Sequence, residues 1–152
     1  MECVILVGLP ASGKTSFYRE YLSATHDHVS KDLIRNNRRP DRRQHQLVTD
    51  ALSAGRSVVV DNTNPTATVR APLIAVARAH GAAVVGYFFP TDARDALRRN
   101  RTRQGAERVP DVAIFTTRKR LEPPVYAEGF DRLYLVTLDE TARAFVVIPQ
   151  TA

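Results

Sequence analysis

The sequence has 152 residues, of which 43% are hydrophobic, and a formal net charge of +6. This length predicts one domain, residues 1–152, with a sizeable core, and no apolar run reaches the ~20 residues of a transmembrane helix. The start of the chain does not read as a secretion signal, so we expect a cytoplasmic protein without a membrane partner. The basic excess suits a partner that carries phosphates, although a solvated arginine-rich surface would give the same composition.

The first predicted strand, residues 3–7, leads into Gly8–Thr15, which fits the phosphate-binding pattern G-x-x-x-x-G-K-[ST]. The two fixed glycines let the backbone curl tightly around an anion. Lys14 would meet the β- and γ-phosphates, and the Thr15 hydroxyl would bind Mg²⁺. We expect ATP or GTP to be bound by Gly8, Ala11, Ser12, Gly13, Lys14, Thr15 and Ser16.

Apolar runs of strand length alternate with longer helical patterns along the rest of the chain. This alternation predicts an α/β fold, with a mostly parallel sheet of about five strands flanked by helices. Further strands are predicted at residues 28–30, 57–61, 83–89 and 133–138, with 145–148 a candidate edge strand. Helices are predicted at residues 41–54, 92–101 and from Pro110 to before Pro123. A helical region up to residue 80 contains Pro72, where we expect a kink or a new helix start. Cys3 is interpreted as a core residue.

Carboxylates follow two predicted strands, at the sheet edge where open α/β proteins place their sites. Asp32 follows the second strand, and Arg35 shares its face if a helix begins there. The pair could take a proton from a hydroxyl group and hold a phosphate, or could be a helix cap and a surface arginine. Asp61 ends the third strand, where it could lie near Mg²⁺ or only cap the turn Asn62–Pro65.

Six arginines lie between residues 94 and 108, on one predicted helix and in the polar loop 102–109 that follows it. At least one could close over the nucleotide phosphates as part of a mobile lid, or the cluster could be a solvated surface. The four histidines, His26, His28, His45 and His80, show no spacing typical of metal ligands and are interpreted as structural or surface residues.

In combination, these segments resemble the P-loop kinase domain of the 5′-hydroxyl polynucleotide kinases. The matching segments occur in the family's order and are Gly8–Thr15, Lys31–Arg35, Asp61–Pro65, Arg99–Arg103, Val109–Pro110, Glu122–Pro124 and Glu128–Phe130. The P-loop is common to many kinases, whereas Asp61–Pro65 and Glu128–Phe130 are more particular to this family.

The resemblance implies an ATP- and Mg²⁺-dependent kinase that phosphorylates the 5′-hydroxyl of DNA or RNA, with an arginine-bearing lid. It implies that Asp32 is the general base, that Lys14 and Arg103 are catalytic, and that Arg99 and Arg103 contact the nucleotide. On the acceptor side it implies Arg35, with Asp61 and Asn64 as further residues of that site. The dense basic segment from Lys31 to Arg43 would then line an acceptor channel.

Many members of the family join this domain to a 3′-phosphatase or a ligase, for which this chain has no room. We therefore expect a stand-alone kinase, with repair proteins as possible partners, or a relative redirected to another hydroxyl group. Two alternatives stay open. One is a P-loop kinase of a small-molecule hydroxyl acceptor, and the other is a non-catalytic ATP-binding module.

Overall fold

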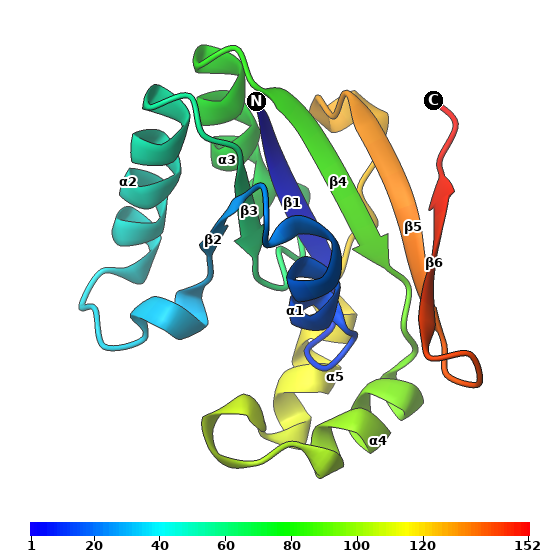
Figure 1. Ribbon diagram of the computed structural model, residues 1–152. Coiled ribbons are helices and arrows are strands. Elements are labelled where there is room, and N and C mark those ends of the chain that lie inside the picture. The colour runs from blue at the N-terminus through cyan, green and yellow to red at the C-terminus, as the bar shows by residue number, and fades with distance from the viewer.

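A six-stranded sheet in the order β2-β3-β1-β4-β5-β6 forms the centre of the computed structural model (Figure 1). The parallel strands are β1 (Glu2–Gly8), β2 (Asp27–Val29), β3 (Val58–Asp61), β4 (Ala83–Phe89) and β5 (Arg132–Asp139). The edge strand β6 (Ala144–Pro149) pairs with β5 in the antiparallel sense. The structure describes residues 1–152, apart from the side chain of Ala106.

Helices pack on both faces of this sheet, with short helical turns between them. The α-helices are α1 (Lys14–Phe17), α2 (Pro40–Ser53), α3 (Ala67–Ala79), α4 (Ala93–Thr102) and α5 (Asp111–Arg120). A π-helical turn, η1 (Tyr18–Leu22), continues α1, and 3-10 turns are η2 (Lys31–Ile34), η3 (Gly105–Glu107) and η4 (Tyr126–Glu128). None of the helices in the described part of the chain is long and apolar enough to cross a membrane.

The central strand β1 divides the core in two, because successive side chains of a strand point to opposite faces. Cys3, Ile5 and Val7 pack with α2 and α3, whereas Val4 and Leu6 pack with Phe17 of α1 and with η1. Burial on both faces explains why the strand is apolar throughout. Burial also raises the pKa of the Cys3 thiol to about 12, in keeping with its predicted place in the core.

The predicted fold class is confirmed, and the observed strands and helices differ from the expected ones mainly at their ends. Of the two alternatives expected at Pro72, a kink or a new helix start, the new start is wrong, because α3 runs unbroken from Ala67 to Ala79. Pro72 is the sixth residue of α3, so its missing N–H removes one hydrogen bond near the start of the helix. The buried side chains of Leu73, Ile74 and Ala77 hold the rest of the helix on the sheet.

A buried ion pair joins α3 to the turn before β5. Arg70 is fully buried, and its Nε and Nη2 donate to the two carboxylate oxygens of Glu128 at 2.8 and 2.9 Å. Its Nη1 donates to the backbone oxygen of Asn64 at 2.8 Å. Arg70 therefore connects the two sequence segments that are most particular to the resemblance, Asp61–Pro65 and Glu128–Phe130.

Replacing Arg70 should destabilise the protein strongly. Arg70→Met leaves the Glu128 carboxylate without its partner in a site of low exposure, and breaking such a pair costs about 3 to 5 kcal/mol. The exposed pair Arg56–Asp27 has a similar distance of 2.9 Å, and Arg56→Met should cost less than about 1 kcal/mol. Urea denaturation of both variants checks this difference, and equal losses would show that burial does not govern the Arg70 interaction.

Candidate active site

The P-loop links β1 to α1 in a tightly curled conformation. Gly13 adopts a φ of 98°, which favours glycine, and Ala11 adopts a φ of 63°. A Cβ atom at Gly8 would lie 2.9 Å from Ser12 Oγ and 3.0 Å from Phe89 Cβ. Glycine is therefore needed at both fixed positions of the motif, for conformation at one and for space at the other.

Lys14 lies at the base of this loop, with its side chain turned back onto the loop itself. Its Nζ donates to the backbone oxygens of Gly8 and Leu9 at 3.1 and 2.6 Å and to Ser12 Oγ at 3.3 Å. Burial away from water lowers the pKa of the ammonium group to about 8, despite the opposing effect of the Asp61 carboxylate. A buried cation beside an anion-sized loop is well suited to phosphate oxygens.

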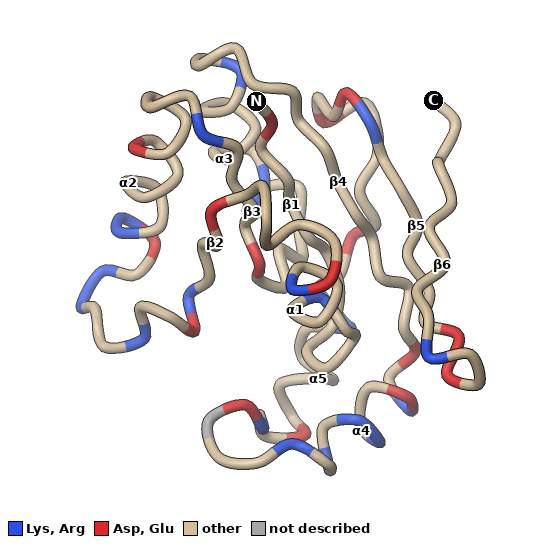
Figure 2. The backbone as a smooth tube through the Cα atoms, viewed as in Figure 1, with Lys and Arg blue, Asp and Glu red and all other residues tan. Residues whose placement is uncertain are grey.

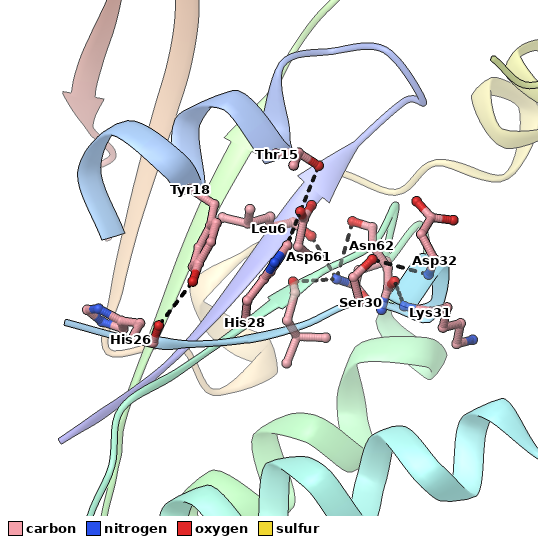
Figure 3. A network of polar contacts seen from close by, with 12 residues as sticks. Leu6, Thr15, Tyr18, His26, His28, Ser30, Lys31, Asp32, Asp61 and Asn62 are labelled. Carbon is pink, nitrogen blue, oxygen red and sulfur yellow. Dashed lines mark hydrogen bonds and ion pairs between the residues drawn. The ribbon is translucent and has the colours of Figure 1, made fainter. Parts of the chain in front are cut away.

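Asp61 connects the P-loop with strand β2 (Figure 3). Its Oδ2 accepts a hydrogen bond from Thr15 Oγ1 at 2.7 Å and lies 2.8 Å from His28 Nε2. The His28 ring stacks on Tyr18, with ring centroids 4.0 Å apart. The structure thus places Asp61 beside Thr15 of the P-loop, and it adds His28, which the sequence analysis interpreted as a structural or surface residue. The available signal was its position in β2, the strand that pairs with β3, which ends in Asp61.

A first cavity of about 250 Å³ lies over the P-loop. Its lining residues come from four segments and are Pro10, Ala11, Ser12, Lys14, Thr15, Lys31, Asp32, Asp61, Asn62, Thr63, Arg103, Glu107 and Val109. A second cavity of about 290 Å³ adjoins it and is lined by Thr15, Ser16, Arg19, His28, Ser30, Asp32, Leu33, Arg35, Arg103 and Glu107. Thr15, Asp32, Arg103 and Glu107 line both cavities, so the two meet at these residues.

Asp32 lies in η2, and Arg35 immediately follows this turn, three residues after Asp32. Ser30 caps the turn by accepting a hydrogen bond from the Asp32 N–H at 3.3 Å, and Arg35 Nε donates to the Asp32 backbone oxygen at 3.1 Å. The Asp32 carboxylate accepts no hydrogen bond from the residues that the structure describes, and it borders both cavities. It is therefore available to a molecule that occupies either of them.

The two arginines assigned to the nucleotide are placed differently. Arg103 lines both cavities, and its Nη1 donates to the Glu107 backbone oxygen at 3.1 Å. Arg99 instead donates through Nε and Nη2 to Glu140 at 3.3 and 3.0 Å and lines neither cavity. Hydrogen bonds from Arg98 and Arg99 hold the pKa of Glu140 at about 2. The mobility of residues 102–109 stays a prediction.

Asn64 does not lie at the acceptor position that the resemblance implied. Its side chain is buried, and Nδ2 donates to the backbone oxygens of Leu6 and Val60 at 2.7 and 3.3 Å. Asn64 also has a φ of 43°, which asparagine tolerates better than most residues. It therefore shapes the turn after β3, and its amide nitrogen is already engaged by backbone oxygens.

The basic segment from Lys31 to Arg43 divides into two groups in the structure. Lys31 lines the first cavity and Arg35 the second. The remaining four arginines, Arg38, Arg39, Arg42 and Arg43, line a separate groove at the start of α2. The expectation of one continuous acceptor channel thus resolves into a site at η2 and a groove beyond it.

A family model described as an AAA domain matches residues 3–124, which is most of the chain and includes the P-loop and strands β2 to β4. The chain belongs to this family. A bifunctional polynucleotide phosphatase/kinase of Schizosaccharomyces pombe is 26% identical over 133 residues, and an Acanthamoeba polyphaga mimivirus protein provisionally given the same description is 29% identical over 144 residues.

These matches cover 85% and 90% of this chain, but the chain spans only about a third of either relative, 32% and 33% of their lengths. A solved gluconokinase from Sinorhizobium meliloti 1021 is 20% identical, with a TM-score of 0.65 over 91% of this chain and 83% of the gluconokinase. At that identity the likeness shows the fold alone, which is that of P-loop kinases. Such a fold implies nucleotide binding.

The buried charge of Lys14 predicts a pH dependence of stability. The ordinary pKa of the side chain is 10.5 and its folded value is about 8, so between these values the unfolded chain holds a proton that the folded protein has lost. Stability should therefore rise with pH across this interval, by about 3 kcal/mol in total. Lys14→Met should remove this rise. Urea denaturation midpoints of the wild type and of Lys14→Met, measured between pH 8 and pH 10.5, check this prediction. The same rise in Lys14→Met would contradict the assigned pKa.

Proposed function

We propose that the chain is an ATP-dependent kinase that transfers the γ-phosphate to the 5′-hydroxyl of a polynucleotide or oligonucleotide. The observation that carries this proposal is the meeting of two cavities at Asp32, whose carboxylate is unengaged by the described residues. One cavity has the P-loop and the buried Lys14, and the other has Arg35 and Arg19. The polynucleotide kinase descriptions of the two relatives support the choice of acceptor.

In the proposed reaction, the residues of the two cavities have separate roles. Asp32 accepts the proton of the 5′-hydroxyl as its oxygen attacks the γ-phosphorus in line, and the bond to the β–γ bridging oxygen breaks to release ADP. Lys14 and Arg103 stabilise the negative charge on the transferring group. Arg35 binds the phosphate that follows the first nucleoside, which fixes the hydroxyl beside Asp32.

The residues present also fit a magnesium ion held mainly by phosphate oxygens and water. Mg²⁺ in kinases commonly takes one or two protein oxygens, and the Thr15 hydroxyl and the Asp61 carboxylate lie 2.7 Å apart at the cavity. Thr15 would bind the ion directly, and the bound ion would neutralise part of the negative charge of the phosphates. Asp61, anchored by His28, would hold the Thr15 hydroxyl at the first cavity.

A kinase of a small-molecule hydroxyl is the second candidate, favoured by the size of the acceptor-side cavity. A volume of about 290 Å³ suits a sugar as well as a single nucleoside, and one solved relative by fold is named a gluconokinase. The three arginines of this cavity, Arg19, Arg35 and Arg103, favour an anionic acceptor in either case. A non-catalytic ATP-binding module would have no use for an unengaged carboxylate between the two cavities.

Transfer of labelled γ-phosphate from ATP separates these candidates. We expect label in a 5′-hydroxyl oligonucleotide, and none in the same oligonucleotide when it carries a 5′-phosphate. Gluconate and neutral polyols added in excess should not reduce the incorporation. Label in the small alcohols with none in the oligonucleotide would establish the second candidate, and ATP binding without any transfer would establish the module.

Variants of Asp32 and Arg35 should change different kinetic constants. Asp32→Asn keeps the shape but removes the base, and it should lower kcat about 100-fold or more, because proton transfer matters only as the hydroxyl attacks. Arg35→Ala should chiefly raise KM for the oligonucleotide, since the phosphate contact exists in both ground and transition states. Asp50→Asn, an exposed change on α2, is the matched control.

Steady-state kinetics with a 5′-hydroxyl oligonucleotide measure both effects. Full turnover by Asp32→Asn would remove Asp32 from the mechanism. An unchanged KM for Arg35→Ala would instead place the acceptor phosphate elsewhere, and neither result would alter the assignment of the P-loop.

A further inference from the structure

A groove rich in arginine lies beyond the two cavities, at the start of α2. It has a volume of about 330 Å³ and is open to solvent along its length. We call it the arginine groove, and its lining residues are Asn37, Arg38, Arg39, Arg42, Arg43 and Gln46. The sequence Arg38-Arg39-Pro40-Asp41-Arg42-Arg43 places two arginines just before the helix and two in its first turn.

The positive charge of this groove is not compensated locally. Within the described part of the chain, none of its four arginines forms an ion pair, and Arg43 Nη1 donates only to Gln46 Oε1 at 3.2 Å. Asp41 is the acidic residue of this segment, and its Oδ1 lies 2.5 Å from Lys31 Nζ. Since Asp41 is paired with Lys31, it does not offset the charge of the four arginines, of which Arg38, Arg39 and Arg42 are exposed and Arg43 is half-buried.

The groove is also fixed relative to the proposed active site. Asn62, which lines the first cavity, accepts a hydrogen bond from the Lys31 N–H at 2.9 Å through Oδ1. Through Nδ2 it donates to Gln44 Oε1 at 2.6 Å, and Gln44 is a buried residue of α2. One side chain therefore ties both the segment that carries Asp32 and the helix that carries the arginines.

The path from the active site to the groove follows the chain itself. Figure 2 shows basic positions in the loop between η2 and α2, and in the sequence Arg35, Arg38 and Arg39 follow Asp32 in that order. Arg35 lines the acceptor-side cavity, and Asn37, two residues later, lines the groove. An extended strand whose end lies at Asp32 can thus continue past Arg35 toward Arg38 and Arg42.

We propose that the arginine groove binds backbone phosphates of the acceptor strand, several nucleotides away from its 5′-hydroxyl. Guanidinium groups match phosphate oxygens in geometry and keep their charge at every physiological pH. A concave groove suits a narrow extended strand better than a flat membrane or a broad protein surface. The inference rests on the proposed function for the identity of the acceptor, and it adds a preference for strands long enough to reach the groove.

Binding measurements with strands of two lengths test this proposal without relying on catalysis. The variant Arg38→Gln/Arg42→Gln/Arg43→Gln is compared with Arg118→Gln/Lys119→Gln/Arg120→Gln, which removes the same charge from exposed positions of α5 that line none of the three cavities described above. Fluorescence anisotropy is recorded with a labelled 5′-hydroxyl dodecamer and with a dinucleotide, across a salt series.

The groove variant should bind the dodecamer at least about tenfold more weakly than the wild type, with a log–log salt slope that is less steep by roughly 0.7 for each lost phosphate contact. Its affinity for the dinucleotide should be unchanged, and the α5 variant should resemble the wild type with both strands. Equal weakening for both lengths, or by both variants, would overturn the proposal and leave only general electrostatic attraction.

A vesicle arm and a kinetic arm keep this result separate from the proposed function. Vesicles of anionic phospholipid that compete with the dodecamer only when the groove is intact would assign the groove to a membrane and overturn the proposal. With a 5′-hydroxyl dinucleotide as acceptor, turnover by the groove variant should equal that of the wild type. If the wild type transfers no phosphate to either oligonucleotide, the proposed function is contradicted. If the wild-type KM is the same for the dinucleotide and the dodecamer, only the role of the groove is contradicted.

Discussion

Five consecutive residues at the end of β3, Asp61–Pro65, are bonded to most of the segments that line the two cavities. Asp61 binds Thr15 and His28, and the Thr63 backbone oxygen accepts from the Gly8 N–H at 3.1 Å, where the P-loop begins. Asn62 holds the Lys31 N–H and Gln44. Because phosphoryl transfer depends chiefly on position and charge, a turn that fixes donor and acceptor segments together constrains the whole reaction.

A buried polar network holds this turn in place. Its groups lose their contacts with water on folding, and their hydrogen bonds fix the orientation of the turn. Arg70 reaches the Asn64 oxygen and Glu128, and the Glu122 N–H donates to the Pro65 oxygen at 2.7 Å. A fully satisfied network of this kind rigidifies its surroundings, whereas one unpartnered member is expensive in a medium of low dielectric constant. The sequence segments around residues 61–65 and 122–130 thus belong to one hydrogen-bonded network, which holds the turn after β3.

The fold was readable from the sequence because its signals are local. Apolar runs bounded by polar turns gave strands β1, β3, β4 and β5, and the alternation with helices gave their parallel order. The tail at 145–148 proved to be an edge strand, and the helix predicted at residues 92–101 is α4, which Asp92 caps. The π-helical turn after α1 and the continuity of α3 through Pro72 depend on packing against the sheet, which the local pattern does not contain.

The site could be predicted from the sequence only where the role of a residue follows from its position in a motif. The P-loop and the position of Asp32 and Arg35 at η2 belong to this group. His28, Gln44 and Arg70 were missed because their contacts join segments far apart in the chain. Asn64 was assigned to the acceptor site, whereas its amide nitrogen bonds backbone oxygens, and the nucleotide contact of Arg99 stays a prediction beside its bond to Glu140. Charge density alone also could not separate Arg35 from the groove arginines.

The central claim is that the turn after β3 holds the segment of Asp32 in register with the P-loop. Amide hydrogen exchange of Asn62→Ala, with Thr63→Ala as control, tests it most directly. The account predicts faster exchange of Lys31 and of the first turns of α2 in Asn62→Ala, with strands β1 and β3 unchanged and the control like the wild type. Unchanged protection at Lys31 and α2 in Asn62→Ala would contradict it.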